Sequence, residues 1–202
     1  MQRADERPET IEVPRGVRFP VELKPPPGFD PARVETWPAV DGRLEYVDGR
    51  LLYMPPCGDI QSDVVTDVAY VLRRWQEAHA DFKVGTNEAG LRLAGASRGA
   101  DAAVFRRADL GEYTGGFRRV PPVLAVEVAG QDDREPQLRE KAAWYLSVGV
   151  PVVWLVLPDT REVIVMTADG ESRHRTGELP AHPALPDLAP AVADFFRQLS
   201  VG

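Results

Sequence analysis

The segment VLAVEVAGQDDREPQLREKAAWYLSVGVPVVWLVL, residues 123–157, decides the fold. It begins and ends with apolar, β-branched runs of strand length, and the polar stretch between them has apolar residues at helical spacing. Strand, helix and strand in this order form a βαβ unit, whose two strands are parallel. The segment therefore predicts an α/β fold with a mixed sheet covered by helices.

An acidic residue, Glu127, lies inside the first of these apolar runs, and Asp101 has a similar place in GADAAVF, residues 99–105. A buried carboxylate is costly unless it is paired, hydrogen-bonded or bound to a metal. If the two strands are antiparallel neighbours, the start of one meets the end of the other, and the acids come together. A divalent cation would then remove their repulsion, and oxygen ligands favour magnesium or manganese over zinc.

A simpler alternative for these acids is that Asp101 caps a turn and Glu127 faces solvent. Lys141 weighs against it, because this lysine lies about two turns into the helix that follows the Glu127 strand. A helix that leaves a parallel strand packs back over the sheet, so we expect the ammonium group near the carboxylates. There it could orient or help deprotonate a water molecule and offset charge on a phosphoryl oxygen. The common alternative for such a lysine is a surface position.

The remaining elements are arranged around this unit. Asp48-Gly49 between two β-prone runs predicts a hairpin over residues 43–54. Apolar residues at three- and four-residue spacing predict a long helix over 58–80. Further predicted elements are a short helix at 31–37, strands at 82–85, 89–94, 101–105 and 162–167, and a last helix at 186–196.

The chain of 202 residues suits one domain, and we predict a proline-rich N-terminal arm at 1–29 and a single domain at 30–202. No apolar run approaches the roughly 18 residues that span a bilayer. Cys57 is the only cysteine and the N-terminus is polar, which predicts a cytoplasmic protein without membrane association. The net charge of −7 argues against broad, nonspecific nucleic-acid binding but leaves room for a local basic groove.

Four blocks of the sequence together resemble the Uma family of candidate endonucleases, which belongs to the PD-(D/E)XK, restriction-endonuclease-like superfamily. The blocks are RLEYVDGRLLYMPP, GADAAVF, VLAVEVAG and EKAAWYLSVGVPVVWLVLPD, and they stand in the family's order between about residues 35 and 197. The resemblance implies a restriction-endonuclease-like mixed β-sheet core flanked by helices, with an extended N-terminal arm. It also implies hydrolysis of DNA phosphodiester bonds with Mg²⁺ or Mn²⁺ and, as in many nucleases of this type, a homodimer.

The resemblance also implies roles for individual residues. The aspartate of the superfamily motif falls on Asp101, its second acid on Glu127, and an upstream acid on Glu45, which reaches the metal directly or through water. The superfamily lysine normally stands two residues after the second acid, where this chain has Ala129. Members of this family resemble a variant with the lysine on the following helix, which makes Lys141 the candidate.

Three positions depart from the family pattern: Ile60 replaces a histidine, Gly130 a serine, and Leu157 an acid before proline. These departures and the acidic net charge favour an alternative, a catalytically inactive module that keeps the nuclease fold for binding or assembly. A hydrolase of another phosphate ester is a third possibility. The arginine pairs 106–107 and 118–119 flank a loop that could contact a phosphate backbone.

Overall fold

The computed structural model describes residues 17, 19–131 and 133–200. In chain order its strands are β1 (Val21–Leu23), β2 (Arg43–Val47), β3 (Arg50–Met54), β4 (Phe82–Leu93), β5 (Ala96–Arg106), β6 (Leu124–Val128), β7 (Val152–Leu157), β8 (Glu162–Thr167) and β9 (Gly170–His174). Its helices are α1 (Asp59–Glu77) and α2 (Glu135–Ser147), and its 3₁₀ turns are η1 (Val34–Thr36), η2 (Arg107–Asp109), η3 (Val192–Phe196) and η4 (Gln198–Ser200).

One mixed sheet joins all the strands of the described part of the chain, in the order β1-β3-β2-β5-β6-β7-β8-β9, with β4 paired to β5. The pair β6 and β7 is parallel and connected by α2, which confirms the predicted βαβ unit. The predicted hairpin is β2 and β3, and Asp48 and Gly49 both have the positive φ that its turn requires. The α/β fold with a mixed sheet is thus confirmed.

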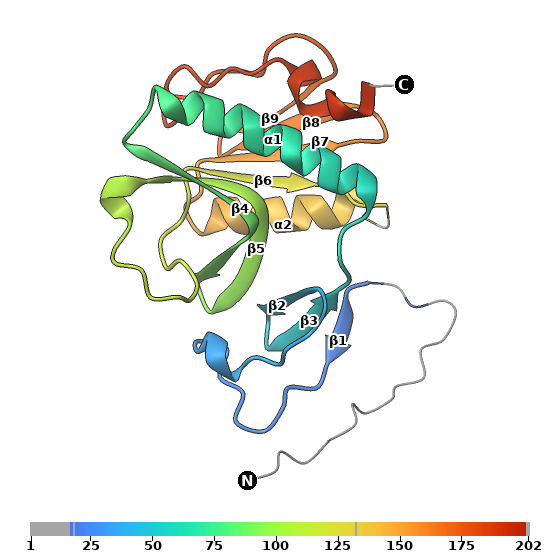
Figure 1. Cartoon of the computed structure of the whole chain (residues 1–202), viewed down its shortest axis with the longest axis vertical. Helices are drawn as coiled ribbons and strands as arrows, with labels where there is room; N and C mark the ends of the chain where they lie inside the picture. Colours follow the sequence, from blue (N-terminus) through green and yellow to red (C-terminus); the bar gives the residue numbers. More distant parts are fainter. Residues whose placement is uncertain (1–16, 18, 132, 201–202) are drawn as a thin grey trace.

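The two helices cover opposite faces of the sheet (Figure 1). The α1 helix and η3 pack on the face that carries Val104, Val126 and Trp154. The α2 helix packs on the other face, against Ala103 and Leu155. Side chains alternate along β6, so Ala125 and Glu127 point toward α2, while Leu124 and Val126 point toward α1. In β5 the alternation is regular from Ala102 onward, but Ala100 packs on the α2 face as Ala103 does.

Several predicted boundaries were wrong. The two short strands expected at 82–85 and 89–94 are one strand, β4, whose register shifts between Thr86 and Ala89. The last helix expected at 186–196 contains only the 3₁₀ turn η3, and the helix expected at 31–37 contains only η1. Both turns are short, and segments of this length commonly adopt 3₁₀ geometry.

The N-terminal region contributes to the sheet through β1, which pairs with β3 although it lies inside the predicted arm. Residues 1–16 of that arm lie outside the described residues, so the division at residue 30 stays a prediction. In the described ranges we find no helix with the length and apolar character needed to cross a bilayer.

The C-terminal turn η3 fixes the chain to the sheet through Phe195, which is fully buried and meets Trp154 edge to face at 5.6 Å. We expect Phe195→Ala to lower the free energy of unfolding by about 3–5 kcal/mol, because the substitution removes a buried ring and leaves a cavity in its place. Urea unfolding would measure this. Tyr113→Ala, at an aromatic position that is 78% exposed, serves as the control and is expected to stay within about 0.5 kcal/mol. Equal effects at both positions would contradict the packing described here.

Candidate active site

The candidate site lies where β5 changes its partner along one edge. The first part of this edge pairs with β2 at Ser97, and the later part pairs with β6 from Ala102 onward. Between these points the ladder on this edge is interrupted, and side chains bond to the backbone groups of Gly99. Glu45 accepts the Gly99 N–H at 3.2 Å, and Lys141 donates to the Gly99 carbonyl at 2.7 Å. Because the sheet offers the Gly99 backbone no partner on this edge, the ionisable side chains of Glu45 and Lys141 supply its hydrogen bonds in the interior.

Asp101 and Glu127 stand opposite each other at this point. The antiparallel register pairs Ala102 with Val126, and continuing it by one residue places the two acids side by side. Directly opposed residues of such strands have Cβ atoms about 4.5–5.5 Å apart. Asp101 Oδ2 accepts the N–H of Val128 at 2.7 Å, so its carboxylate substitutes for a backbone acceptor. The structure thus brings together the two acids that the sequence analysis paired.

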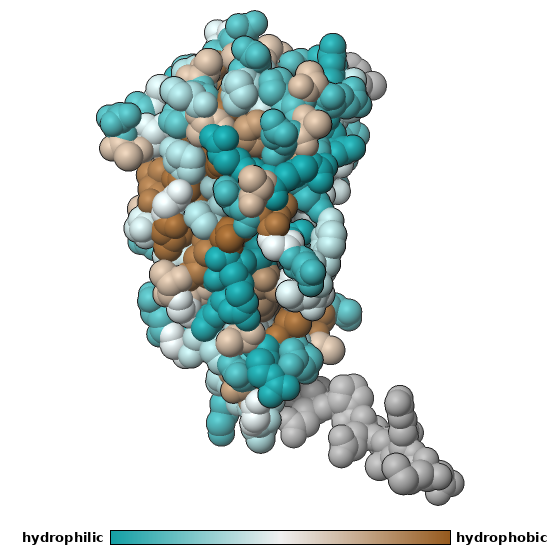
Figure 2. Space-filling model, turned by 90° about the vertical axis from the view of Figure 1, so that its left-hand side faces the viewer, coloured by the Kyte–Doolittle hydropathy of each residue, from teal (hydrophilic) through white to brown (hydrophobic). Residues whose placement is uncertain are grey.

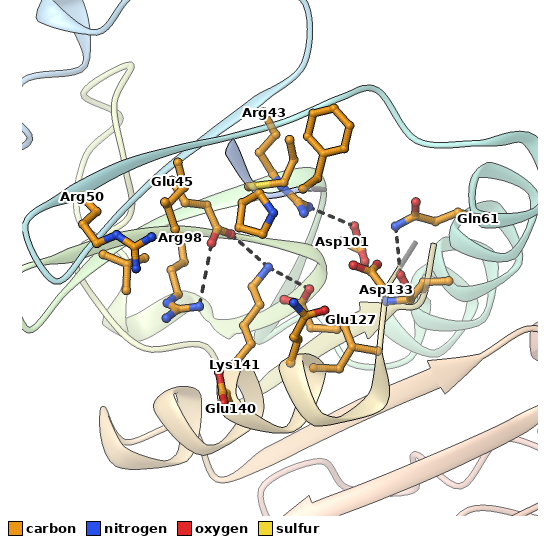
Figure 3. A pocket seen from close by; sticks show the side chains of 18 of the residues that line it. Arg43, Glu45, Arg50, Gln61, Arg98, Asp101, Glu127, Asp133, Glu140 and Lys141 are labelled. Atoms are coloured by element: carbon orange, nitrogen blue, oxygen red, sulfur yellow. Dashed lines mark hydrogen bonds and ion pairs between the residues drawn. The ribbon is translucent and has the colours of Figure 1, made fainter. Parts of the chain in front are cut away.

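Lys141 extends from α2 into the centre of the cluster (Figure 3). Its Nζ donates to Glu127 Oε2 at 2.8 Å and to the Gly99 carbonyl at 2.7 Å, and it lies 3.0 Å from Glu45 Oε1. Three donor directions of the ammonium group meet three acceptors. Lys141 is 8% exposed, so the surface position considered as an alternative does not apply.

Tyr145 is a residue of this cluster that the sequence analysis missed as a site residue. Its fully buried hydroxyl lies 2.7 Å from Glu127 Oε1 and 3.2 Å from the Gly99 carbonyl. The sequence did contain a signal for it, because residues four apart on a helix lie on one face, and Tyr145 follows Lys141 at this spacing. Both oxygens of Glu127 are thus held by side chains of α2.

Glu45, from the hairpin strand β2, faces the same cluster. It is 5% exposed, and besides Gly99 and Lys141 it has Arg98 at 3.8 Å from its Oε2. The hairpin therefore supplies a third carboxylate, held mainly by Lys141 and backbone rather than by the other two acids. Its predicted part as a metal ligand stays a prediction.

A cavity of about 320 Å³ opens onto these groups. All four predicted site residues line it, Asp101, Glu127, Lys141 and Glu45. Arg43 also lines it, and one of its terminal nitrogens is 3.7 Å from Asp101 Oδ1 (Figure 3). Six acidic and four basic side chains form its wall, so the wall as a whole favours a cation.

Burial and charge shift the protonation of the cluster in opposite directions. Burial raises the pKa of the Glu127 carboxyl to about 8, and Asp101 adds to this shift while Lys141 opposes it. Burial by itself favours the neutral amine of Lys141, but the charges of Glu127 and Glu45 outweigh it and raise the pKa of the lysine. Lys141 is therefore a permanent ammonium group near neutral pH, and Glu127 is the titrating member of the pair.

Glu45 remains ionised for a different reason. Burial opposes its charge, yet Lys141, Arg43 and Arg98 together lower the pKa of this carboxyl. The hydroxyl of Tyr145 stays protonated, because burial and the neighbouring carboxylate Glu127 raise its pKa well above the usual value. The cluster thus offers a hydroxyl donor and an ammonium donor to Glu127 throughout the neutral range.

The donor set suits a hard cation. Mg²⁺ is commonly held by one or two carboxylates, with water and substrate phosphate as its other ligands. Asp101 and Glu127 supply two such carboxylates beside one cavity. In the described ranges no group of three or more His, Cys, Asp or Glu side chains is arranged to hold a metal ion. The oxygen chemistry of Asp101 and Glu127 is of the kind that Mg²⁺ and Mn²⁺ prefer, and the assignment of an ion to these residues stays a prediction.

The comparisons with known proteins agree with this fold. The family model Uma2, described as "Putative restriction endonuclease", matches residues 31–200, so the chain belongs to the Uma2 family. The chain is also similar to a crystal structure from Anabaena variabilis ATCC 29413, described as "a putative nuclease belonging to DUF820". The TM-score is 0.72 at 17% identity, over 82% of this chain and 96% of that chain. This likeness shows a restriction-endonuclease-like fold. No curated protein matches the chain.

The three departures from the family pattern leave the acids of the site in place. At Gly130 an added Cβ would lie 2.8 Å from Gln61 Oε1. Gln61 in turn donates to the Val128 carbonyl at 2.9 Å and so ties α1 to the end of β6. Ile60 is half-exposed and Leu157 is buried at the end of β7. Glycine at 130 therefore accommodates the contact between Gln61 and β6.

The arginine pairs lie on the side of the molecule formed by β4, β5 and the loop after them. Figure 2 shows this side, where hydrophilic areas alternate with smaller hydrophobic patches. Arg106 lies over the Phe82 ring at 5.4 Å, and Arg119 donates to the Ala32 carbonyl at 3.1 Å. These arginines have structural contacts of their own, and their expected contact with a phosphate backbone stays a prediction.

The raised pKa of Glu127 predicts a pH dependence of stability. The folded protein keeps this proton between about pH 4.5 and about pH 8, where the unfolded chain has lost it. The free energy of unfolding therefore falls as the pH rises through this window, by at most about 1.4 kcal/mol per pH unit. Urea unfolding in the presence of a chelator would measure this slope.

Glu127→Gln is expected to lose this part of the slope, since the amide does not titrate. Glu112→Gln, at an exposed position, is the matched control and is expected to keep the slope of the parent. Parallel curves for the parent and Glu127→Gln between about pH 5 and about pH 8 would contradict the assignment of the proton to Glu127.

Proposed function

We propose that this protein is a metal-dependent endonuclease that hydrolyses DNA phosphodiester bonds in the cavity between β2, β5, β6 and α2. One observation carries the proposal: Asp101 and Glu127 line one cavity from neighbouring strands, with the ammonium group of Lys141 bonded to the second of them. Membership of the Uma2 family supports a nuclease role. Fold alone is weak support for activity, so the residues of the cavity carry the argument.

In this proposal Asp101 and Glu127 hold a Mg²⁺ or Mn²⁺ ion, and Glu45 assists directly or through water. The ion, when bound, supplies Lewis acidity that polarises the phosphoryl oxygen and lowers the pKa of bound water. The Val128 N–H fixes the orientation of Asp101, and the Tyr145 hydroxyl fixes that of Glu127. These contacts preorganise the two carboxylates, so little reorganisation accompanies the reaction.

Lys141 acts as a fixed positive charge. Its raised pKa makes it a poor base, so we assign it the positioning of water and the stabilisation of charge that develops on a phosphoryl oxygen. Its contacts with Glu127 and the Gly99 carbonyl hold it at the cavity wall.

A second candidate function is a nuclease-fold module that binds without catalysis. The specific observation in its favour is that Lys141 already lies at hydrogen-bond distance from both Glu127 and Glu45, and Arg43 and Arg98 add to the positive charge beside Glu45. Such a cluster is internally compensated and has no need of a metal ion. Metal binding separates the two candidates, because only the nuclease is expected to bind the ion at Asp101.

The cleavage test uses plasmid DNA, single-stranded DNA and a small phosphodiester, each with Mg²⁺ or Mn²⁺. We expect the parent to cut DNA and both Asp101→Asn and Glu127→Gln to lose at least about 100-fold in rate, as is typical when a group that stabilises the transition state is removed. Asp169→Asn and Glu112→Gln, at exposed positions, are the matched controls and are expected to cut like the parent.

Equal rates for the parent and both acid variants would contradict the proposal, since shared activity then comes from a contaminating nuclease. Hydrolysis of the small ester without cleavage of either DNA would instead support a hydrolase of another phosphate ester.

Metal binding has a readout that does not depend on catalysis. We expect Mn²⁺ at about 100 times its Kd to raise the free energy of unfolding of the parent by about 2.7 kcal/mol. Asp101→Asn is expected to lose this gain, Glu45→Gln to lose part of it, and Asp169→Asn to keep it. Urea unfolding with and without the ion measures the effect. An equal gain in the parent and in Asp101→Asn would place the ion elsewhere, and no gain in the parent would favour the inactive module.

A further inference from the structure

Arg98 is a cation of the cavity wall that the proposed mechanism does not use. It lies on β5, three residues before Asp101, and its side chain is 16% exposed. The guanidinium group lies over the ring of Trp144 at 5.0 Å, and one terminal nitrogen is 3.8 Å from Glu45 Oε2 (Figure 3). Trp144 belongs to α2, so the arginine is held between the helix and the hairpin.

The contacts of Arg98 differ in kind from those of Lys141. Lys141 donates at 2.7 and 2.8 Å, within the range of hydrogen bonds. The contact of Arg98 with Glu45 is longer than that range, and its buried Nε has no hydrogen-bond partner among the described residues. A buried donor without an acceptor is unfavourable, and the cost is larger for a charged group. Since Arg98 lines the cavity and its terminal nitrogen is beyond hydrogen-bond distance of Glu45, its guanidinium group retains donor capacity there.

The chemistry of the guanidinium group indicates what it would bind. Its N–H groups form a planar fork that matches the oxygens of a phosphate or carboxylate and can bond to two of them at once. The six acids of the cavity wall would repel a carboxylate ligand. For a phosphodiester bound to the metal ion, the positive charge of the ion would offset this repulsion. In a nuclease site the available anion is the phosphate of the bound strand. The cation–π contact with Trp144 holds the guanidinium group beside the cavity.

We propose that Arg98 is a substrate-binding residue whose guanidinium group holds a phosphate of the nucleic-acid strand in the cavity. The identity of this ligand rests on the proposed nuclease function, while the presence of an anion-binding arginine rests on the geometry. Binding at Arg98 fixes where the strand lies relative to Asp101 and Glu127. It thereby adds a positively charged contact to a cavity whose wall is acidic overall.

The test measures binding and turnover separately. Fluorescence anisotropy with a labelled single-stranded oligodeoxynucleotide gives Kd, with Ca²⁺ in place of Mg²⁺ to hold the metal position without turnover. For Arg98→Gln we expect Kd to rise about tenfold or more, from the loss of a charge-assisted contact. We also expect the slope of log Kd against log salt concentration to fall by about 0.7, from the loss of one phosphate contact. In cleavage assays KM is expected to rise more than kcat falls.

Arg33→Gln is the matched control, because Arg33 is exposed and forms an ion pair with Glu35, which is exposed as well. It is expected to leave Kd and the salt slope unchanged. Arg98→Lys keeps the charge but loses Nε and the planar fork, and we expect an affinity between those of the parent and Arg98→Gln. If Arg98→Gln does not fold, the Kd of Arg98→Lys is compared with that of the parent, after a thermal unfolding curve has shown that the two proteins have the same midpoint.

The outcomes separate this inference from the proposed function. The inference would be overturned if the Arg98 variants had the Kd and the salt slope of the parent, or if the parent did not bind the oligodeoxynucleotide. An ordered water molecule would then be the hydrogen-bond partner of Nε. Binding that depends on Arg98 in a parent that cuts no DNA would support the inference and contradict the nuclease. Cleavage by the parent with an unchanged KM in Arg98→Gln would contradict the inference and leave the nuclease in place.

Discussion

The carbonyl and N–H of Gly99 are the point on which the site depends. They lie where β5 has left β2 and has not yet joined β6, so the sheet offers them no partner along that edge. A buried peptide group must be satisfied by something else, and here it is satisfied by Lys141 and Glu45. Ionisable side chains lie in the interior here because they supply the hydrogen bonds that the buried backbone of Gly99 requires. Once buried together, these side chains shift one another's pKa values.

This arrangement explains how a chain with a net charge of −7 keeps three carboxylates together in its interior. Lys141, Arg43 and Arg98 compensate them, and Tyr145 adds a neutral donor to Glu127. The compensation is uneven, because Glu127 titrates near pH 8 while Glu45 stays ionised. A site with one proton that a hard cation can displace couples metal binding to pH.

The central part of the fold was predictable because its signals are local. Apolar runs at 123–128 and 152–157, with a helix between them, have few alternatives, and Asp48-Gly49 specifies a tight turn. The edges were not predictable in the same way. The β9 strand, GESRH, is polar and was missed. It is held by pairing with β8 and by Arg173, which bonds to the buried Glu162 at 2.7 Å. Such a strand depends on contacts that its own pattern does not contain.

The sequence by itself determined the βαβ unit, the hairpin and the two acids embedded in apolar strands, because strand and helix periodicity and the cost of a buried charge are readable along the chain. It also placed Lys141 on the correct helix. Only the tertiary structure decided that β5 exchanges partners at Gly99, that Tyr145 bonds to Glu127, and that Arg98 stacks on Trp144. These features depend on the approach of segments far apart in the chain, and local patterns carry no information on which backbone groups such an approach leaves unpaired.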